Sequence, residues 1–428
     1  MTKKRKQRNK KTKKIFIFIL IIVIGFILVF VLHEEHLKRL EKEEVELIEN
    51  IKSKYAKNVK VNKKTNLYDK NGKVMGTINK DVELVLDDVE VSKDTKYFKI
   101  ITIEDSYIKY NDVDKIDSIK LSSRYKNYIP FNKNIVTKDK TTFYDENDKF
   151  LYTINKSYDV PIIINDTTSY GVEFNNQLLY IHKDDVVKEY DNKNTELHNS
   201  SGVAVLNYHA FYDENDSEAR KNCTTEICHS KKQFKTHLEY FKKNKIFTVT
   251  MDELEKYMDG KLQLPKSLLI TIDDGPKTEV AVDLLTEYKM NATIFLVTSW
   301  FDEEKYYKTD YIELHSHSHN MHDGGECPGG QGGAIKCWPE DKILADLKQS
   351  REDLNGSIAF CYPFYEHNNY SEQMLKKAGF RMAFIGEVPF KGGYKLATVG
   401  GDKFKIPRFV IVTYTTLNDF DRYFNQIH

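Results

Sequence analysis

The chain has 428 residues, more than one hydrophobic core usually holds, so its length predicts two or more domains. The formal net charge is +1, yet the first fourteen residues contain nine Lys or Arg and no acid, which leaves 56 basic against 64 acidic residues in the remainder. A nucleic-acid-binding domain needs clustered positive charge to neutralise phosphates. The mildly acidic body therefore excludes nucleic acid as a partner.

The basic tail, residues 1–14, is followed by an apolar stretch over residues 15–32, IFIFILIIVIGFILVFVL. It has no charged or hydrogen-bonding side chain and is long enough to cross a bilayer as a helix. No small-residue cleavage site follows it, which favours an uncleaved anchor over a signal peptide. Because the Lys/Arg excess precedes the span, we expect a single-pass cell-membrane protein with a cytoplasmic N-terminus and an extracellular remainder.

Residues 33–56 are rich in Glu, Lys and Leu, with Leu37, Leu40, Leu47 and Ile51 at helical spacing. This pattern predicts a helical stalk. Two heptads interrupted by Glu44 are short for autonomous pairing, so dimerisation through the stalk is a hypothesis only.

The next segment contains an internal repeat with an offset of 76 residues. The sequence LYDKNG at 67–72, followed by TINK at 77–80, recurs as FYDEND at 143–148, followed by TINK at 153–156. Both copies alternate short β-branched and aromatic runs with Asn/Asp/Gly turns, which predicts two small all-β modules at 57–120 and 121–190. In size and pattern they resemble bacterial SH3-like modules. Cell-wall contact and a simple spacer role are both compatible with them.

An Asn/Asp/Lys/Ser-rich linker is expected at 191–201, and from residue 202 apolar runs alternate with helical periodicity. Strands are expected at 203–207, 267–272, 292–298, around Ile312, at 358–362 and at 382–386, with helices at 232–243, 278–289, 342–354 and 371–378. This alternation predicts an α/β domain over 202–428 with a parallel sheet, a (β/α) barrel-like fold. Functional residues are expected at the carboxyl ends of its strands.

Two acids, Asp273 and Asp274, end the apolar run SLLITI. Adjacent carboxylates repel each other, and a nearby cation would resolve this by binding one and leaving the other free to take a proton. An ordinary polar Asp-Asp-Gly turn is the alternative interpretation.

Four histidines, His315, His317, His319 and His322, lie within eight residues in ELHSHSHNMH. Imidazole is a common zinc ligand, and two imidazoles with one carboxylate leave positions open for water and substrate. The cluster therefore indicates a divalent metal site, with zinc as the expected metal, that activates water.

In order and spacing, TIDDG, SHSHNMH and YPF resemble the motifs of the NodB-homology polysaccharide deacetylases, carbohydrate esterase family four. The opening LNYHAF and the helix QFKTHLEYF, with Phe234, His237 and Leu238, resemble the poly-N-acetylglucosamine deacetylase branch. The resemblance covers residue 202 to the C-terminus. It implies a metal-dependent hydrolase that removes N-acetyl groups from a polysaccharide.

By this resemblance, Asp273 is the general base and Asp274 a metal ligand. Two spacings exist for the histidine ligands: four residues apart, which would select His315 and His319, or five apart in the pattern Glu-x-x-Ser-His-Ser/Thr-x-x-x-His. The second pattern is matched at every position by Glu313, Ser316, His317, Ser318 and His322. We therefore expect His317 and His322 to complete the metal site.

The third motif reads Cys361-Tyr362-Pro363-Phe364-Tyr365 where the family commonly has Arg-x-Pro-Tyr/Phe-Gly, so the arginine that steadies the base is absent. Tyr362 and Pro363 are expected to shape the wall of the site, and a backbone N–H near Phe364 to help hold the oxyanion. A terminal Leu-x-x-His motif is also absent.

Two residues are candidates to replace the missing groups. His209, at the end of LNYH, is a possible general acid or a pocket-lining residue, and a return of the proton by Asp273 is the alternative. Arg408, in KIPRFVI, is either the missing positive charge beside the base or a packing residue.

Five cysteines fit an extracellular location. Cys223 and Cys228 are five apart, and Cys327 and Cys337 bracket a Gly-rich loop, so two disulfides are expected and Cys361 stays single. A zinc site is the competing interpretation, although C-x-x-C spacing is lacking.

The predicted function is N-deacetylation of an N-acetylglucosamine polymer, either peptidoglycan or poly-N-acetylglucosamine. Two alternatives from other classes are a membrane-anchored, non-catalytic wall-binding scaffold and an O-acetyl esterase on the same fold. The absent arginine and terminal histidine favour the scaffold, whereas the Asp-Asp and His set opposes it.

Overall fold

The computed structural model describes residues 2–54, 58–86, 97–100, 106–118, 123–174, 176–192, 198–300, 309–386 and 395–428. Five residues of the expected linker, 193–197, and parts of the predicted module boundaries lie outside these ranges. The chain divides into two compact units. The first comprises 1–121, 139–157 and 174–177, and the second 122–138, 158–173 and 178–428.

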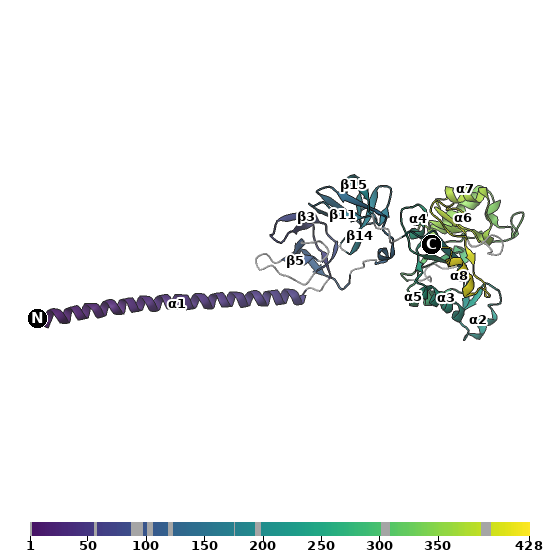
Figure 1. Ribbon diagram of the computed structural model, residues 1–428. Coiled ribbons are helices and arrows are strands. Elements are labelled where there is room, and N and C mark those ends of the chain that lie inside the picture. The colour runs from purple at the N-terminus through teal and green to yellow at the C-terminus, as the bar shows by residue number, and fades with distance from the viewer. Residues whose placement is uncertain are drawn as a thin grey trace. The chain divides into compact units, whose positions relative to one another are not determined.

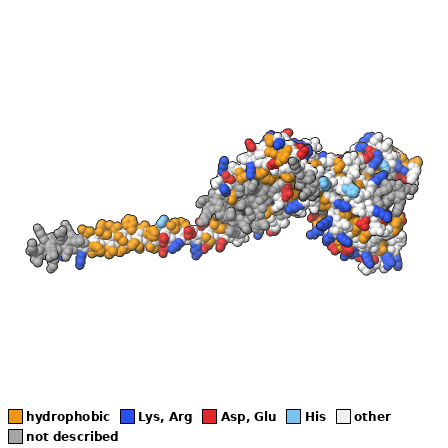
Figure 2. All heavy atoms as spheres, viewed as in Figure 1, with side chains coloured by type: hydrophobic (Ala, Val, Ile, Leu, Met, Phe, Trp, Pro, Cys, Tyr) orange, Lys and Arg blue, Asp and Glu red, His pale blue; other side chains and the backbone are white. Residues whose placement is uncertain are grey.

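Helix α1 (Thr2–Lys54) contains both the apolar stretch and the Glu/Lys/Leu-rich residues after it (Figure 1). The apolar side chains of 15–32 are exposed, and Figure 2 shows them as a continuous band followed by charged side chains. Within the described residues this is the helix long and apolar enough to cross a membrane. An exposed apolar surface of this length is stable in lipid and unfavourable in water.

The repeat of the β region appears as two sequence copies that pair with each other within the first unit. Strand β3 (Val74–Ile78) runs antiparallel to β10 (Phe150–Ile154), with Thr77 opposite Thr153. Gly76 is required there, because a Cβ at this position would lie 2.0 Å from the carbonyl oxygen of Thr153.

The two copies also share a turn. The carboxylates of Asp69 and Asp145 each accept two backbone N–H groups, from the residues two and four positions later. The first unit also contains β1 (Asn58–Val61), β2 (Thr65–Tyr68), β4 (Glu83–Val85), β5 (Tyr97–Ile100), β6 (Ser106–Lys109), β7 (Val113–Lys115) and β9 (Thr141–Tyr144). By their contacts, residues 139–157 therefore belong to the same unit as the first copy of the repeat. The predicted modules, 57–120 and 121–190, instead place one copy of the repeat in each module.

The second unit begins with short strands that belong, in sequence, to the second copy. These are β8 (Lys133–Thr137), β11 (Asp159–Pro161), β12 (Ile164–Asn165), β13 (Ser169–Phe174), β14 (Gln177–His182) and β15 (Val186–Asp191). The last residue of β13 and the first residue of β14 are assigned to the first unit. Strand β8 lies between β11 and β15 in an antiparallel sheet.

The α/β part is a parallel sheet in the order β24-β23-β22-β21-β20-β16-β25, with β19 also pairing with β20. Its strands are β16 (Val203–Tyr208), β19 (Phe247–Thr248), β20 (Ser267–Asp274), β21 (Ala292–Leu296), β22 (Ile312–Ser316), β23 (Ala359–Cys361), β24 (Met382–Phe384) and β25 (Phe409–Val410). All strands expected from the apolar runs are present. The sheet is a half-barrel that stays open on one side, since its edge strands β24 and β25 are not paired with each other.

Helices α3 (Lys231–Lys243), α5 (Glu279–Tyr288), α6 (Glu340–Asp353) and α7 (Asn369–Lys377) confirm the four predicted amphipathic helices (Figure 1). Three further helices were not predicted: α2 (Ser217–Lys221), α4 (Met251–Met258) and α8 (Leu417–Phe424). A short parallel pair, β17 (Ala210–Tyr212) with β18 (Cys228–Ser230), was also missed. These elements are short, so their periodicity in the sequence is weak.

One core packs the sheet against α3, α5 and α8, and another lies under α6 and α7. The segment after β24 crosses between the sheet edges: Ile406 bridges to Phe384 of β24, and β25 then pairs with β16. Arg408 lies between these two pairings, at the gap in the half-barrel.

Candidate active site and metal centre

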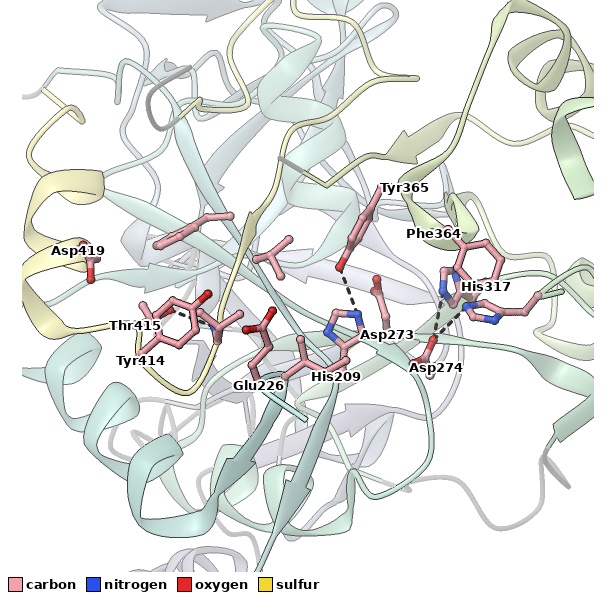
Figure 3. Close-up of a pocket in the computed structure, with 15 residues that line it drawn as sticks. His209, Glu226, Asp273, Asp274, His317, Phe364, Tyr365, Tyr414, Thr415 and Asp419 are labelled. Carbon is pink, nitrogen blue, oxygen red and sulfur yellow. Dashed lines mark hydrogen bonds and ion pairs between the residues drawn. The ribbon is translucent and has the colours of Figure 1, made fainter. Parts of the chain in front are cut away.

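Three parallel strands carry polar residues to one edge of the sheet. Strand β20 ends in Asp273 and Asp274, β22 is followed directly by His317, and β23 ends at Cys361. Their carboxyl ends meet at the same edge, where ligands bind in parallel α/β sheets. A pocket of about 470 Å³ lies there, lined by His209, Glu226, Ile227, Asp273, Asp274, His317, His322, Phe364, Tyr365, Phe409, Val410, Val412, Tyr414, Thr415 and Asp419 (Figure 3).

Asp274, His317 and His322 converge on one point. Oδ1 of Asp274 lies 3.4 Å from Nε2 of His317 and 3.3 Å from Nε2 of His322. Ligands held about 2.0–2.1 Å from a tetrahedral zinc ion are about 3.3 Å apart. Both distances from Asp274 thus match those around a zinc ion, and the three donor atoms all lie within 4.8 Å of one another, so these residues form a group that could hold a metal ion.

The surrounding chain fixes these three side chains. Nδ1 of His317 lies 2.8 Å from the carbonyl oxygen of Cys361, so Nδ1–H donates there and Nε2 is left as a ligand atom. Asp274 has a φ of 74°, a left-handed conformation at the end of its strand. The ring of His322 packs between Trp300 and Phe364, with centroid distances of 5.1 and 4.7 Å.

The electrostatics of this group favour a cation. Burial opposes a charge on His317, but its interactions with Cys361 and with the carboxylates of Asp274 and Asp273 raise the pKa of the imidazole well above its ordinary value. Burial likewise opposes ionisation of Asp274, yet the hydrogen bonds from His317 and His322 lower the pKa of its carboxyl group. Positive charge, either a proton or a metal ion, is therefore stabilised between these residues.

Asp273 lies beside this group and pairs with Arg408. The guanidinium binds both carboxylate oxygens, at 2.7 and 2.8 Å, and both side chains are almost fully buried. Arg408 also donates to Oγ1 of Thr271 and to the carbonyl oxygen of Ile385. Burial alone would raise the pKa of Asp273, but Arg408 and His317 hold it below the ordinary value, so Asp273 is a carboxylate at neutral pH.

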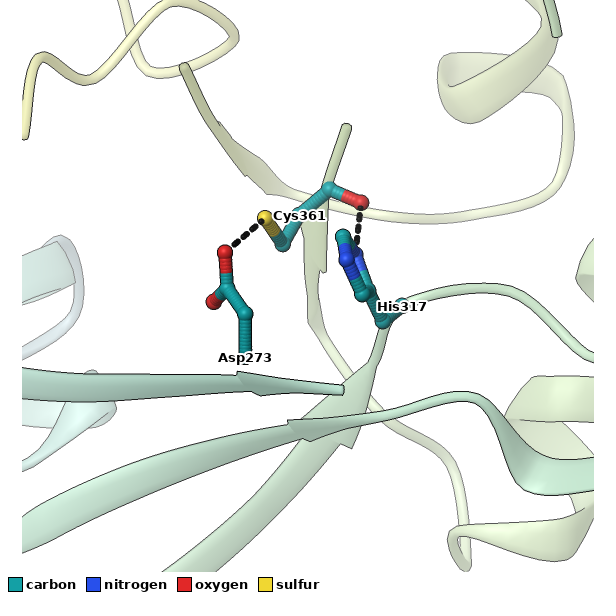
Figure 4. Close-up of side chains that lie close together, drawn as sticks. All are labelled: Asp273, His317 and Cys361. Atoms are coloured by element: carbon teal, nitrogen blue, oxygen red, sulfur yellow. Dashed lines mark hydrogen bonds between the residues drawn. The ribbon is translucent and has the colours of Figure 1, made fainter. Parts of the chain in front are cut away.

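The thiol of Cys361 completes the surroundings of Asp273 (Figure 4). Its sulfur lies 3.2 Å from Oδ2 of Asp273 and 2.9 Å from Nη2 of Arg408. Burial raises the pKa of Cys361, so the group is a neutral thiol that donates to the carboxylate. Asp273, His317 and Cys361 form a second group with metal-ligand spacing. Arg408 already neutralises Asp273 there, which disfavours a cation at that point.

The structure separates the four clustered histidines. His315 is turned towards Oγ of Ser357, at 3.0 Å, and His319 lies between Thr298 and Asp353. Neither lines the pocket. Of the two ligand spacings in the sequence, the geometry brings together the pair five apart, His317 and His322.

Glu313, in the same motif, lies outside the pocket and accepts the backbone N–H of Met251 at 2.8 Å. Ser316 and Ser318 cap the loop, since Oγ of Ser316 accepts from the backbone N–H of Ser318 and Oγ of Ser318 from that of Met321. Residues of this motif thus stabilise the loop as well as supplying the two histidines of the pocket.

His209 enters the pocket beside Asp273, and its Nε2 lies 3.2 Å from the hydroxyl of Tyr365. Burial lowers the pKa of His209 against the opposing effect of Asp273 and Asp274, so the imidazole is neutral at neutral pH. Sequence reasoning missed Tyr365 and its second partner, Asn207. The only signal for Tyr365 is its place at the glycine position of the third motif.

The expected wall residues are only partly at the pocket. Phe364 lines it, whereas Tyr362 is fully buried and Pro363 is buried, and neither lines it. Tyr362 instead packs with Phe360 in the core under α6 and α7. Arg408 is likewise buried behind the pocket and contacts Asp273 instead of forming a surface for substrate.

The cysteines are arranged in two pairs and one thiol. Cys223 is paired with Cys228 and Cys327 with Cys337, with Cα–Cα distances of 5.6 and 5.8 Å. Each pair closes a short loop near the site: Glu226 and Ile227 line the pocket, and the second loop directly follows His322. Cys361 is free and buried.

A protein-family model matches the part of the chain that carries this geometry. The family model described as "Polysaccharide deacetylase" matches residues 261–383, which contain the Asp-Asp pair, the histidine cluster and the third motif. The resemblance to polysaccharide deacetylases, first drawn from those motifs, is thereby confirmed.

The chain is also similar to a named protein and to solved structures. The chain is 26% identical over 243 residues to "Poly-beta-1,6-N-acetyl-D-glucosamine N-deacetylase" of Staphylococcus aureus (strain MRSA252), covering 49% of this chain and 79% of the relative. Among solved structures it is similar to a de-N-acetylase from Aggregatibacter actinomycetemcomitans (19% identity, TM-score 0.43, covering 52% of this chain and 99% of that one). It is also similar to IcaB from Ammonifex degensii (18% identity, TM-score 0.42, covering 53% and 96%).

Proposed function

We propose that the protein is a metal-dependent polysaccharide N-deacetylase, which hydrolyses the 2-acetamido group of N-acetylglucosamine units. The observation that carries the proposal is the convergence of Asp274, His317 and His322 in one pocket, beside an Asp273 carboxylate that Arg408 holds outside the group. The family match and the named relatives support it.

Asp274, His317 and His322 would hold the metal, with zinc as the proposed ion because two imidazoles and one carboxylate are a usual zinc set. When bound, such an ion polarises the acetyl carbonyl and lowers the pKa of water. His317 is oriented for this role by its hydrogen bond to the backbone of Cys361.

Asp273 is the proposed general base. Its carboxylate takes a proton from the water that attacks the acetyl carbon, and then gives that proton to the departing amine nitrogen. Arg408 and the thiol of Cys361 hold the carboxylate in place and keep it ionised before the reaction. A backbone N–H near Phe364 is proposed to help stabilise the oxyanion, and His209 to contact the substrate beside Asp273.

We propose a poly-N-acetylglucosamine polymer as the substrate in preference to peptidoglycan, since the named relatives act on the former. Incubation of each polymer with the zinc-loaded protein, followed by mass spectrometry, tests this. Loss of acetyl mass from poly-N-acetylglucosamine alone is expected. Loss from peptidoglycan alone would reverse the substrate assignment, O-acetyl release alone would indicate an esterase, and no release from either would leave a non-catalytic scaffold.

For the rest of the chain we propose the organisation read from the sequence. Residues 15–32 anchor the protein in the cell membrane, 1–14 are cytoplasmic, and 33–56 form a stalk outside the cell. The β modules, 57–120 and 121–190, are proposed SH3-like spacers that contact the wall, and the linker at 191–201 leads to the deacetylase domain at 202–428. The exposed apolar band of α1 and the two cysteine pairs support an anchored, extracellular enzyme.

A further inference from the structure

Tyr365 occupies the position at which the third motif commonly has glycine. Its φ is 61°, and that of the preceding Phe364 is 58°. This left-handed region favours glycine and disfavours bulky side chains. A tyrosine held there must be fixed by its surroundings, and such residues gather at functional sites.

The surroundings of the Tyr365 ring are built to receive it. A Cβ at Gly386 would lie 2.4 Å from Cδ1 of Tyr365, so the ring can lie there only because residue 386 is glycine. The guanidinium carbon of Arg408 is 5.5 Å from the ring centroid. The ring thus lies over the guanidinium of Arg408. It also lines the pocket (Figure 3).

The hydroxyl of Tyr365 has two partners. It lies 2.7 Å from Oδ1 of Asn207 and 3.2 Å from Nε2 of His209. Asn207 and His209 are two residues apart along β16 and its end, so their side chains leave the strand on the same face.

The directions of these hydrogen bonds follow from the donor inventory. Nδ2 of Asn207 donates to the carbonyl oxygen of Tyr208 at 3.1 Å, which turns Oδ1 towards Tyr365 as an acceptor. The single hydroxyl hydrogen of Tyr365 therefore goes to Asn207. The phenol oxygen must then accept from His209, and this places the imidazole proton on Nε2.

We infer that Tyr365 is a positioning residue that, with Asn207, holds His209 as the Nε2–H tautomer beside Asp273, so that His209 does not serve as the proton donor. The inference rests on the proposed function. Nδ1 of His209 carries no proton in this tautomer, and it is buried and has no partner among the described residues. The Nε2–H is directed to Tyr365, so neither ring nitrogen is placed to give a proton to the leaving amine. The leaving amine then receives its proton from Asp273.

Two further observations agree with this arrangement. Burial lowers the pKa of His209, so the ring is neutral and has a defined tautomer. Burial and the neighbouring Asp273 raise the pKa of Tyr365 well above its ordinary value, so the phenol keeps the hydrogen that it gives to Asn207.

The substitution Tyr365→Phe tests the inference, since it removes the hydroxyl and keeps the ring over Gly386. In the full-length zinc-loaded protein with ¹⁵N-labelled histidine, we expect wild-type His209 to show a proton on Nε2 and the variant to show a tautomer mixture. We expect kcat/KM on a poly-N-acetylglucosamine oligomer to fall about tenfold, the size of one lost hydrogen bond, with zinc content unchanged. In a His209→Ala background the same substitution should cause no further loss.

The matched control is Tyr257→Phe. The hydroxyl of Tyr257 donates to the carbonyl oxygen of Ser200 at 2.7 Å, outside the pocket, so this variant should keep full activity and the wild-type His209 spectrum. An unchanged His209 spectrum in Tyr365→Phe, or an equal loss of activity in the His209→Ala background, would overturn the inference. If the wild-type protein releases no acetate, the proposed function fails, and the His209 spectrum alone then decides whether Tyr365 sets the tautomer.

Discussion

Asp273 and Asp274 are neighbours in sequence with opposite surroundings. Asp273 is paired with a buried guanidinium, whereas Asp274 faces two imidazoles. The left-handed backbone at Asp274 turns the two carboxylates apart. This separation allows one residue to bind a cation while the other stays free for proton transfer.

Substitution of each aspartate should separate these roles. We expect Asp273→Asn to retain zinc and to lower kcat by about 10²–10⁴-fold, since general base catalysis is lost. Asp274→Asn should lose zinc and activity together, because a ligand is removed. Metal analysis of the purified variants alongside acetate release measures both effects; an Asp273→Asn variant that loses zinc while Asp274→Asn keeps it would reverse the assignment.

Arg408 should set the pH range in which Asp273 acts. The guanidinium lowers the pKa of Asp273, so a weaker cationic partner lets that pKa rise. We therefore expect Arg408→Lys to move the acid limb of the kcat/KM profile to higher pH. Arg351→Lys, at a guanidinium that binds the carbonyl oxygen of Ser357 away from the pocket, is the control with an unshifted profile. An identical acid limb in Arg408→Lys would show that Arg408 does not tune the base.

At the scale of elements, β22 and α4 meet through Glu313. Burial raises the pKa of this carboxyl to about 7, although the backbone N–H of Met251 opposes the shift. The folded state thus binds a proton more tightly than the unfolded state. The contribution of Glu313 to the free energy of unfolding is therefore largest below the pKa of the unfolded state. It is lost as the pH rises through the pKa of the folded state, so it declines between about pH 4.5 and 7.

Glu313→Gln keeps an oxygen for the N–H of Met251 and cannot ionise. We expect it to raise the free energy of unfolding at pH 8 by on the order of 2 kcal/mol, with little change at pH 4.5. Urea titrations of wild type and variant at both pH values measure this difference. A variant that is less stable at pH 8 would mean that the carboxylate form is the stabilising one.

Sequence periodicity predicted the long elements because each buries one face or one run of apolar residues. The strands around 267–272 and 292–298 and helices α3 and α5 are examples. Short elements such as β25 and β17 carry too few residues for a pattern. The pairing of β3 with β10 could not be predicted either, because a repeat in sequence does not reveal that its copies pair with each other.

Site residues that are close together in the sequence could be predicted from a motif, whereas the contacts of distant residues could not. His317 and His322 follow from one motif, whereas Arg408 reaches Asp273 across 135 residues through the crossing after β24. From the sequence, Arg408 could be either the positive charge beside the base or a packing residue. The roles of Cys361 and Tyr365 depend on side-chain directions and left-handed backbone that the motif does not encode.

At the scale of the whole molecule, helix α1 bears on the location of the protein. Its exposed apolar band is long enough to cross a membrane, and the basic residues before it predict a cytoplasmic N-terminus. We expect a membrane-impermeant maleimide to label His36→Cys in intact cells and Lys10→Cys only after permeabilisation. The native cysteines give little background, since four are paired and Cys361 is buried. Labelling of Lys10→Cys in intact cells would invert the topology.

The proposed mechanism depends most on where a metal binds. Anomalous scattering at the zinc absorption edge, from crystals of the zinc-loaded protein, locates the metal directly. We predict one peak in the pocket within about 2.0–2.2 Å of Oδ1 of Asp274, Nε2 of His317 and Nε2 of His322. A peak among Asp273, His317 and Cys361 instead, or no peak at either group, would contradict the proposed mechanism.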